Sequence, residues 1–276
     1  MFDRVVGFDG GADEVMSYGG VTPDAVRDLV HGCIFTRGPQ DLKNTAIFIG
    51  GTDMTRGEEL LAAVTRAFFG PMRVSVMLDA NGSNTTAVAA VAKLTQTAGG
   101  DINGQRAVVV AGTGPVGLRA AGLLAKAGAD VTITSRKAAD PARIDALVTR
   151  FGGTVRSVAM PDAARAARVL DSAGLVLNAG PAGVQLVPKD AWANRAGLRA
   201  AVDLNAVPPL GIEGIEVMDD GVEREGVVVF GALGAGKLKM KIHKACIARL
   251  FERNDAVLDA ETIAGIARDI AQPKPA

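Results

Sequence analysis

A glycine-rich loop behind a short apolar strand constrains this chain most. Residues 107–111 form a continuous Val-rich run, typical of a parallel strand buried on both faces. A complete G-x-G-x-x-G follows at residues 112–117, then a helical stretch and a second strand at residues 131–134. In such a loop, the first glycine permits a tight turn, the second admits a pyrophosphate and the third lets the helix pack closely. The sequence therefore predicts a dinucleotide site, against a plain Gly-rich turn. Its candidate residues are Gly112, Thr113, Gly114, Pro115, Val116 and Gly117.

The end of the second strand indicates which dinucleotide is bound. An NAD site normally places Asp or Glu there to hold the ribose 2′-hydroxyl, whereas this chain has Ser135, Arg136 and Lys137. A hydroxyl and two cations attract a 2′-phosphate, so the sequence favours NADP. The alternative is that Arg136 and Lys137 are ordinary solvated loop charges.

Composition excludes several classes of protein. The 276 residues are 48% hydrophobic and 22% charged, which is typical of a globular chain long enough for two domains. Because 30 Lys and Arg balance 30 Asp and Glu, we expect no general binding of nucleic acid or of an acidic membrane. The two cysteines, Cys33 and Cys246, indicate a reducing compartment and argue against a disulfide scaffold or a cysteine-rich metal site; we expect no bound metal. The chain shows no signal peptide and no membrane span, so we expect a cytoplasmic protein.

Strand and helix patterns alternate through both halves of the chain, which indicates an α/β fold. In the first region we expect strands at residues 4–8, 46–49 and 74–78 and helices that start at Thr22 and cover residues 56–68 and 87–97. The predicted organisation is a small parallel α/β domain at 1–103, a Rossmann-type domain at 104–237 and a helical segment at 238–276 that returns to the first domain. We expect residues 272–276 to be frayed.

Polar or Gly-rich loops follow the later strands of the second region. After a helix near residues 143–151, we expect strands at 175–177, 200–204 and 227–230. Because ligands of doubly wound sheets bind at the carboxyl ends of the strands, these loops are candidates for cofactor binding. The candidates are Ala179, Gly180, Pro181 and Asn205. The acidic residues at 219–220 and 223–225 are interpreted as a solvated hairpin.

The loops taken together resemble one enzyme family. The motifs that carry the resemblance are FDGGAD at 8–13, AIFIGG at 46–51, LDANGSNTT at 78–86, AGTGPVGLRAA at 111–121, NAGPAG at 178–183, DLNAVPPLGIEGI at 203–215 and GALGAGKLKMKIHKACI at 231–247. They closely resemble those of the bacterial NADP-dependent methylene-tetrahydromethanopterin dehydrogenases, some of which also oxidise methylene-tetrahydrofolate. The resemblance covers nearly the whole chain and implies a homo-oligomer with a pterin-binding first domain.

The resemblance also implies site residues. Lys239 and Lys241 match a Lys-x-Lys segment of the family; Lys239 is our first choice for a catalytic role, and Lys237 is an additional base beside the cofactor. Asp9 and Asp13 would accept hydrogen bonds from the pterin, unless they are simple turn carboxylates. A polar set is assigned in part to the substrate and in part to helix capping: Asp79, Asn81, Ser83, Asn84 and Thr85.

The implied chemistry needs little acid–base catalysis. Loss of a hydride from a carbon between two nitrogens leaves a nitrogen-stabilised methenyl cation, so no base has to remove a proton. This agrees with a chain whose only histidines are His31 and His243, for which we favour a helix-end and a packing or phosphate-neighbour role. Two alternatives stay open: a dehydrogenase of another small substrate such as a shikimate-type hydroxy acid, and a non-catalytic NADP(H)-binding regulator. The sequence does not choose between methanopterin and folate, and leaves cyclohydrolase activity and the direction of the reaction open.

Overall fold

The computed structural model describes residues 2–271 and divides into two compact units. The first unit comprises residues up to Thr85 together with those from Met240 onward, and the second unit is Thr86–Lys239. Both boundaries fall inside helices, α4 (Ser83–Thr97) and α8 (Ala232–Leu250). The sequence had placed its boundaries at residues 103 and 237. Among the described residues, no helix combines the length and apolar character needed to cross a membrane.

The second unit is built on a seven-stranded sheet with the order β5-β4-β3-β6-β7-β9-β8. The pairings are parallel except for that between β8 and β9. The strands are β3 (Arg106–Val110), β4 (Asp130–Ser135), β5 (Thr154–Ala159), β6 (Leu175–Asn178), β7 (Ala200–Asp203), β8 (Asp220–Arg224) and β9 (Val227–Phe230). This confirms the predicted α/β fold with a Rossmann-type parallel sheet, in which β3 is central and its Gly-rich loop lies where the strand order reverses.

Helices cover the two faces of this sheet unequally. Helices α5 (Pro115–Lys126) and α6 (Pro141–Phe151) lie on the face that carries Ile133, whose side chain sits directly under Gly112. On the opposite face the crossover after β5 contains only the short 3₁₀ turn η3 (Ala163–Arg165) and α7 (Ala166–Val169). Trp192, which follows the 3₁₀ turn η4 (Lys189–Ala191), fills the core on that side with Val108, Val110 and Ile212.

The first unit contains a small parallel sheet with the order β1-β2-β10. Its strands are β1 (Ala46–Ile49), β2 (Ser75–Leu78) and β10 (Val257–Leu258). The helical elements are α1 (Phe2–Asp9), α2 (Val26–Ile34), η1 (Pro39–Asn44), α3 (Met54–Ala67), η2 (Ala80–Gly82) and α9 (Ala260–Ala271). The predicted strands at 46–49 and 74–78 are confirmed, and β10, near the end of the chain, pairs with β2.

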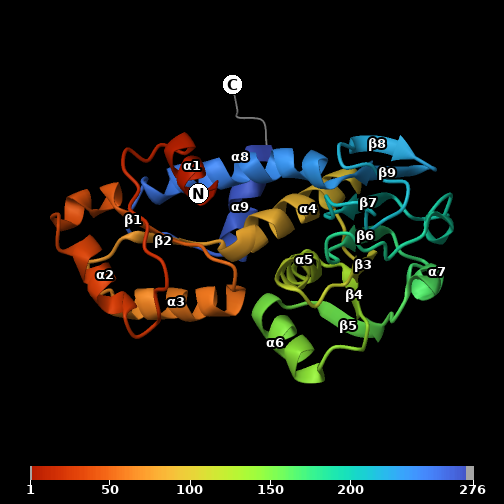
Figure 1. The fold of residues 1–276 in the computed structure, drawn as a ribbon, viewed down its shortest axis with the longest axis horizontal. Helices are drawn as coiled ribbons and strands as arrows, with labels where there is room; N and C mark the ends of the chain where they lie inside the picture. The colour runs from red at the N-terminus through yellow and green to blue at the C-terminus, as the bar shows by residue number, and fades with distance from the viewer. Residues whose placement is uncertain (1, 272–276) are drawn as a thin grey trace. The chain divides into compact units, whose positions relative to one another are not determined.

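Two predictions for the first 30 residues were wrong. Residues 4–8 lie in helix α1 and not in a strand, and Figure 1 shows α1, in red, beside α8. The short apolar run fits either structure, and packing decides, because Gly10 lies directly against Ile247 of α8. Helix α2 begins at Val26 without a side-chain cap and not at Thr22, whose carbonyl accepts a bond from the Ala25 amide in a preceding turn. The fraying expected of residues 272–276 lies outside the described residues.

The acidic hairpin of β8 and β9 is confirmed, but one of its carboxylates is not solvated. Asp219 is buried and accepts hydrogen bonds from Arg224 Nε at 2.7 Å, Arg224 Nη2 at 2.8 Å and the Glu216 amide at 2.8 Å. Burial raises the pKa of Asp219, while the bonds from Arg224 and the Glu216 amide lower it and hold it below its ordinary value. This residue therefore anchors the hairpin in its ionised form.

Candidate functional site

The Gly-rich loop joins β3 to α5 as the sequence predicted. Gly114 is the N-cap of α5, Pro115 occupies the first helical position, and a Cβ added at Gly114 would meet nothing within 4 Å. By contrast, a Cβ at Gly117 would come within 2.6 Å of Gly112 Cα, so the helix start and the loop are in direct contact. The first amides of a helix have no partner within it, so this end of α5 presents free donors to an anion.

The loop is fixed to the neighbouring strand β4 by hydrogen bonds. The Gly112 amide donates to the Thr134 carbonyl at 2.8 Å, and the Ala111 amide donates to Thr134 Oγ1 at 3.1 Å. The two chain segments that would bind the pyrophosphate and the adenosine ribose are therefore held side by side. Ser135, at the end of β4, donates its hydroxyl to the Lys137 carbonyl and so closes the turn after the strand.

Arg136 and Lys137 project from this turn as exposed side chains. Among the described residues neither makes a side-chain hydrogen bond or an ion pair within the chain. Two uncompensated cations thus stand at the end of the strand beside the Gly-rich loop, where a dinucleotide fold holds the adenosine ribose.

The loops that follow β6 and β7 are joined by two buried side chains, Asn178 and Asp203. Asp203 Oδ1 accepts from Asn178 Nδ2 at 2.8 Å and from the Asn205 amide at 3.0 Å, and Asp203 Oδ2 accepts from the Ile212 amide at 2.9 Å. Gly211 passes so close that an added Cβ would lie 1.8 Å from Asn178 Nδ2. These contacts allow no side chain at this position.

Asn205 extends the same network to the NAGPAG loop. Its Oδ1 accepts from the Val207 amide at 2.9 Å and the Gly183 amide at 3.4 Å, and its Nδ2 donates to the Pro181 carbonyl at 3.4 Å. The Gly180 amide donates to Asn178 Oδ1 at 3.2 Å. The sequence analysis named Asn205 as a cofactor contact together with Ala179, Gly180 and Pro181. In this structure Asn205 is nearly fully buried, so it positions the loop of the other three.

In the first unit, the LDANGSNTT segment folds around the carboxylate of Asp79. Asp79 Oδ1 accepts from the amides of Asn84 at 2.8 Å and Thr85 at 3.0 Å, and Asp79 Oδ2 accepts from Thr85 Oγ1 at 2.6 Å. Asp79 is 1% exposed, so it organises the start of α4. Within the predicted polar set, Asp79 and Thr85 are therefore the residues that cap the helix.

Two other members of this set retain hydrogen-bonding capacity. Ser83 Oγ and Asn84 Oδ1 are buried and have no hydrogen-bond partner among the described residues, although Asn84 Nδ2 donates to the Leu78 carbonyl at 2.6 Å. Asn81, at the turn of the same loop, has a φ of 54°. Unsatisfied buried polar atoms are costly, so these two oxygens have capacity left for an ordered water or for a ligand that opens this segment.

A buried aromatic stack lies in the same unit. The ring of His243 in α8 is fully buried and stacks on Phe48 of β1, with 5.6 Å between centroids, and Phe2 of α1 lies 6.2 Å away. Cys246, one turn further along α8, is also buried; burial, followed by the nearby charge of Asp79, raises the pKa of this thiol to about 12. These contacts support the packing role expected for His243.

The remaining predicted residues are spread over several environments. Asp9 ends α1, where no strand precedes it, and pairs with Lys244 Nζ at 2.7 Å, while Asp13 is exposed. Lys237 pairs with Asp220 at 3.4 Å, Lys239 is half-buried and Lys241 is exposed, all three on α8. Within residues 2–271, no group of three His, Cys, Asp or Glu side chains is arranged to hold a metal ion.

Sequence reasoning missed Asn178, Asp203 and Gly211. Asn178 directly follows the predicted strand at 175–177, Asp203 lies inside the one at 200–204, and Gly211 lies in the loop beyond it. Their roles depend on contacts that form on folding and that leave no local pattern in the sequence. The same holds for Thr134, whose hydroxyl supports the Gly-rich loop.

Comparison with known proteins places these features in a family. Residues 1–81 match the family described as methylene-tetrahydromethanopterin dehydrogenase, N-terminal. Over 98% of this chain and 94% of the relative, the chain is 50% identical to the "Bifunctional protein MdtA" of Methylorubrum extorquens. It is 32% identical, over the same shares, to the "NAD(P)-dependent methylenetetrahydromethanopterin dehydrogenase" of that organism.

Solved structures support the fold. Shikimate 5-dehydrogenase from Listeria monocytogenes, solved with shikimate and NAD, superposes with a TM-score of 0.52 at 14% identity, covering 99% of this chain and 92% of that chain. At this identity the likeness extends to the fold alone.

Proposed function

Because the chain belongs to the methylene-tetrahydromethanopterin dehydrogenase family, we propose that it transfers a hydride from methylene-tetrahydromethanopterin to NADP, giving the methenyl form. The observation that carries the choice of cofactor is the open end of α5 at Gly114 together with the uncompensated Arg136 and Lys137. The shikimate-type and regulatory alternatives are not favoured by the family relationship.

The residues of the second unit fit a bound NADP. The free amides at the start of α5 would hold the pyrophosphate, and the absence of a side chain at Gly114 leaves room for it. Arg136 and Lys137 would bind the 2′-phosphate through charge-assisted hydrogen bonds. The buried bonds of Asn178, Asp203 and Asn205 would hold the neighbouring loop rigid, with Ala179, Gly180 and Pro181 against the cofactor. Bound NADP supplies a hydride acceptor.

In the first unit, Ser83 and Asn84 stay predicted contacts of the pterin. Their oxygens have no partner in the described chain, and because they are buried, contact with the pterin requires this segment to open. Asp79 and Thr85 would act indirectly, by fixing the start of α4. Lys239 is the cation that we assign to the carrier, with Lys241 as a further contact and Lys237 as a further cofactor contact; Asp9, Asp13 and Asn81 stay predicted contacts.

Positioning carries this mechanism. The departing hydride leaves a cation that the adjacent nitrogen of the carrier stabilises, so the protein needs only to orient the bridge carbon and exclude water. His243 takes no part, because its ring is fully buried and stacks on Phe48. Oxidation of methylene-tetrahydrofolate by the same site, a homo-oligomeric state and a cytoplasmic location stay predictions.

The direct test is a rate measurement. Purified protein is mixed with NADP and methylene-tetrahydromethanopterin, and NADPH formation is followed by absorbance, with methylene-tetrahydrofolate and shikimate in parallel reactions. We expect turnover with the methanopterin carrier and none with shikimate. Shikimate oxidation would support the other dehydrogenase, and tight NADP binding without any turnover would support the regulator.

A further inference from the structure

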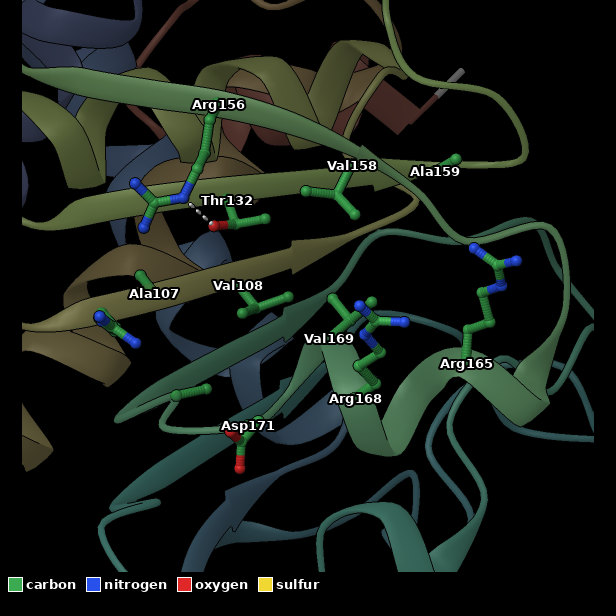
Figure 2. A pocket seen from close by; sticks show the side chains of 12 residues that line it. Ala107, Val108, Thr132, Arg156, Val158, Ala159, Arg165, Arg168, Val169 and Asp171 are labelled. Atoms are coloured by element: carbon green, nitrogen blue, oxygen red, sulfur yellow. Dashed lines mark hydrogen bonds between the residues drawn. The ribbon is translucent and has the colours of Figure 1, made fainter.

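The second unit has a cavity on the face of its sheet opposite α5. Its volume is about 360 Å³, and strands β3, β4 and β5 form its floor while the short α7 segment forms one side (Figure 2). Val108, Thr132 and Arg156 are register partners on adjacent strands, so their side chains project from the same face. Ile133, one residue further along β4, projects to the other face against Gly112. The cavity therefore lies on the side of the sheet away from the helix of the Gly-rich loop.

Arginines gather around this cavity. Arg156 is fixed by bonds to Asp130 Oδ2 at 2.6 Å and Thr132 Oγ1 at 3.1 Å. Arg165 and Arg168 extend from the η3–α7 segment, as Figure 2 shows, and are exposed. Neither guanidinium group makes a hydrogen bond or an ion pair with the part of the chain that the structure describes.

Two nearby carboxylates contact other arginines. Asp130 is bound to Arg156, and Asp171, which also lines the cavity, pairs with Arg195 at 3.4 Å. Arg165 and Arg168 thus leave an uncompensated positive charge at the rim. The floor beneath is mixed: Val108 is buried and Val158 is 38% exposed, and Thr132 and Arg156 project from the same face.

We propose that this cavity is a second anion site, which binds a nucleotide-sized organic phosphate. A planar ring would pack on Val108 and Val158, and the phosphate would accept paired hydrogen bonds from Arg165 and Arg168, the geometry that guanidinium groups favour. The volume lies within the range of small-molecule sites, about 300–1,000 Å³. The site differs from the Gly-rich loop in lying on the opposite face of the sheet.

The experiment titrates AMP into the full chain by calorimetry, with NADP present at saturation. Bound NADP occupies the Gly-rich loop, so AMP cannot bind there. Any remaining heat of AMP binding therefore reports a separate site. We expect one AMP per chain. The Gly114→Val variant, whose Gly-rich loop is blocked, should bind AMP equally well without NADP. Because this measurement does not rely on NADP binding, it tests the second site independently of the proposed function. Failure of AMP to bind the NADP-saturated chain, or its displacement by NADP, would overturn the proposal.

Variants separate charge from shape. The double variant Arg165→Ala/Arg168→Ala should weaken AMP binding by at least ~10-fold through lost charge-assisted bonds, whereas Arg143→Ala, an exposed arginine of α6, should change it less than ~2-fold. Val158→Trp fills the floor, so it should weaken AMP but leave inorganic pyrophosphate within ~3-fold. Equal losses in the Arg143 variant and the double variant would show nonspecific attraction and would refute the site.

Discussion

Asn178 donates its side-chain amide to the carboxylate of Asp203 over 2.8 Å, and this buried bond joins the ends of two adjacent parallel strands, β6 and β7. Asp203 accepts two further bonds, from the amides of Asn205 and Ile212. Three buried hydrogen bonds therefore converge on this one carboxylate. The loops that follow β6 and β7 therefore form one rigid surface.

We predict that Asp203→Ala strongly destabilises the protein. The change leaves the Asn178 side chain and two backbone amides buried without an acceptor, at about 1–3 kcal/mol for each donor. The free energy of unfolding, measured with urea, should fall by about 3 kcal/mol or more. Asp171→Ala is the matched control, because that side chain is exposed and makes one long contact; it should change stability by less than about 0.5 kcal/mol. Similar losses in the two variants would contradict the buried network.

The local signals in the sequence were enough to predict the Gly-rich loop and most strands of the second unit. Buried parallel strands such as β3 and β6 are continuous apolar runs, and the loop after β3 has a fixed spacing of glycines. The two-residue strand β10 is too short to show periodicity, and the apolar run in α1 is ambiguous between helix and strand.

Tertiary relationships explain the other misses. The roles of Asp203 and Asp219 depend on partners brought in by folding, as when Arg224 reaches Asp219 across the hairpin. Asp79 was recognised as polar and loop-bound, but only the structure shows that both of its oxygens serve the start of α4. Composition also gives no sign that α7 is too short to cover the sheet beside β5.

Gly114→Val should abolish NADP binding without unfolding the chain. Gly114 has a φ of −75°, which other residues adopt, and its added Cβ would meet no protein atom within 4 Å, so the larger side chain occupies only the space expected for the pyrophosphate. We expect the Kd for NADP to rise at least ~100-fold, with an unchanged melting temperature. Gly19→Val, at another open position, should leave both values unchanged. A folded Gly114 variant that still binds NADP tightly would refute the cofactor site.

Arg136→Ala should reduce the preference for NADP. Loss of a charge-assisted contact to the 2′-phosphate, about 2–3 kcal/mol, should raise the KM for NADP by up to ~100-fold and leave the KM for NAD nearly unchanged. Steady-state kinetics with both cofactors measures the difference, with Arg143→Ala as the control for a general loss of positive charge. Equal increases for NADP and NAD would show that Arg136 does not contact the phosphate.

Asp219 should contribute stability that disappears in acid. Burial raises its pKa, but the Arg224 side chain and the Glu216 amide lower it further, so the folded-state pKa lies below the unfolded value. A group of this kind stabilises the fold above its unfolded pKa, about 3.9, and loses that contribution as the pH falls through the folded-state pKa. Urea unfolding midpoints should therefore decline below about pH 4 in the wild type. The decline should be shallower in Asp219→Asn, and identical slopes would contradict the assignment.

Lys239 and the two histidines separate positioning from proton transfer. Lys239→Ala should lower kcat/KM for the pterin carrier without abolishing the reaction, and Lys239→Arg should recover part of it if charge and reach are what matter.

His31→Ala should leave kcat within a few-fold. His243→Ala removes a fully buried ring from its stack with Phe48, so it should cost about 2–4 kcal/mol of stability, yet the folded enzyme should keep kcat within a few-fold. A general acid–base residue contributes about 10²–10⁴-fold, well outside that range. Loss of activity by such a factor in either histidine variant, with folding and NADP binding intact, would show that the reaction depends on a titrating base and would favour a proton-transfer substrate.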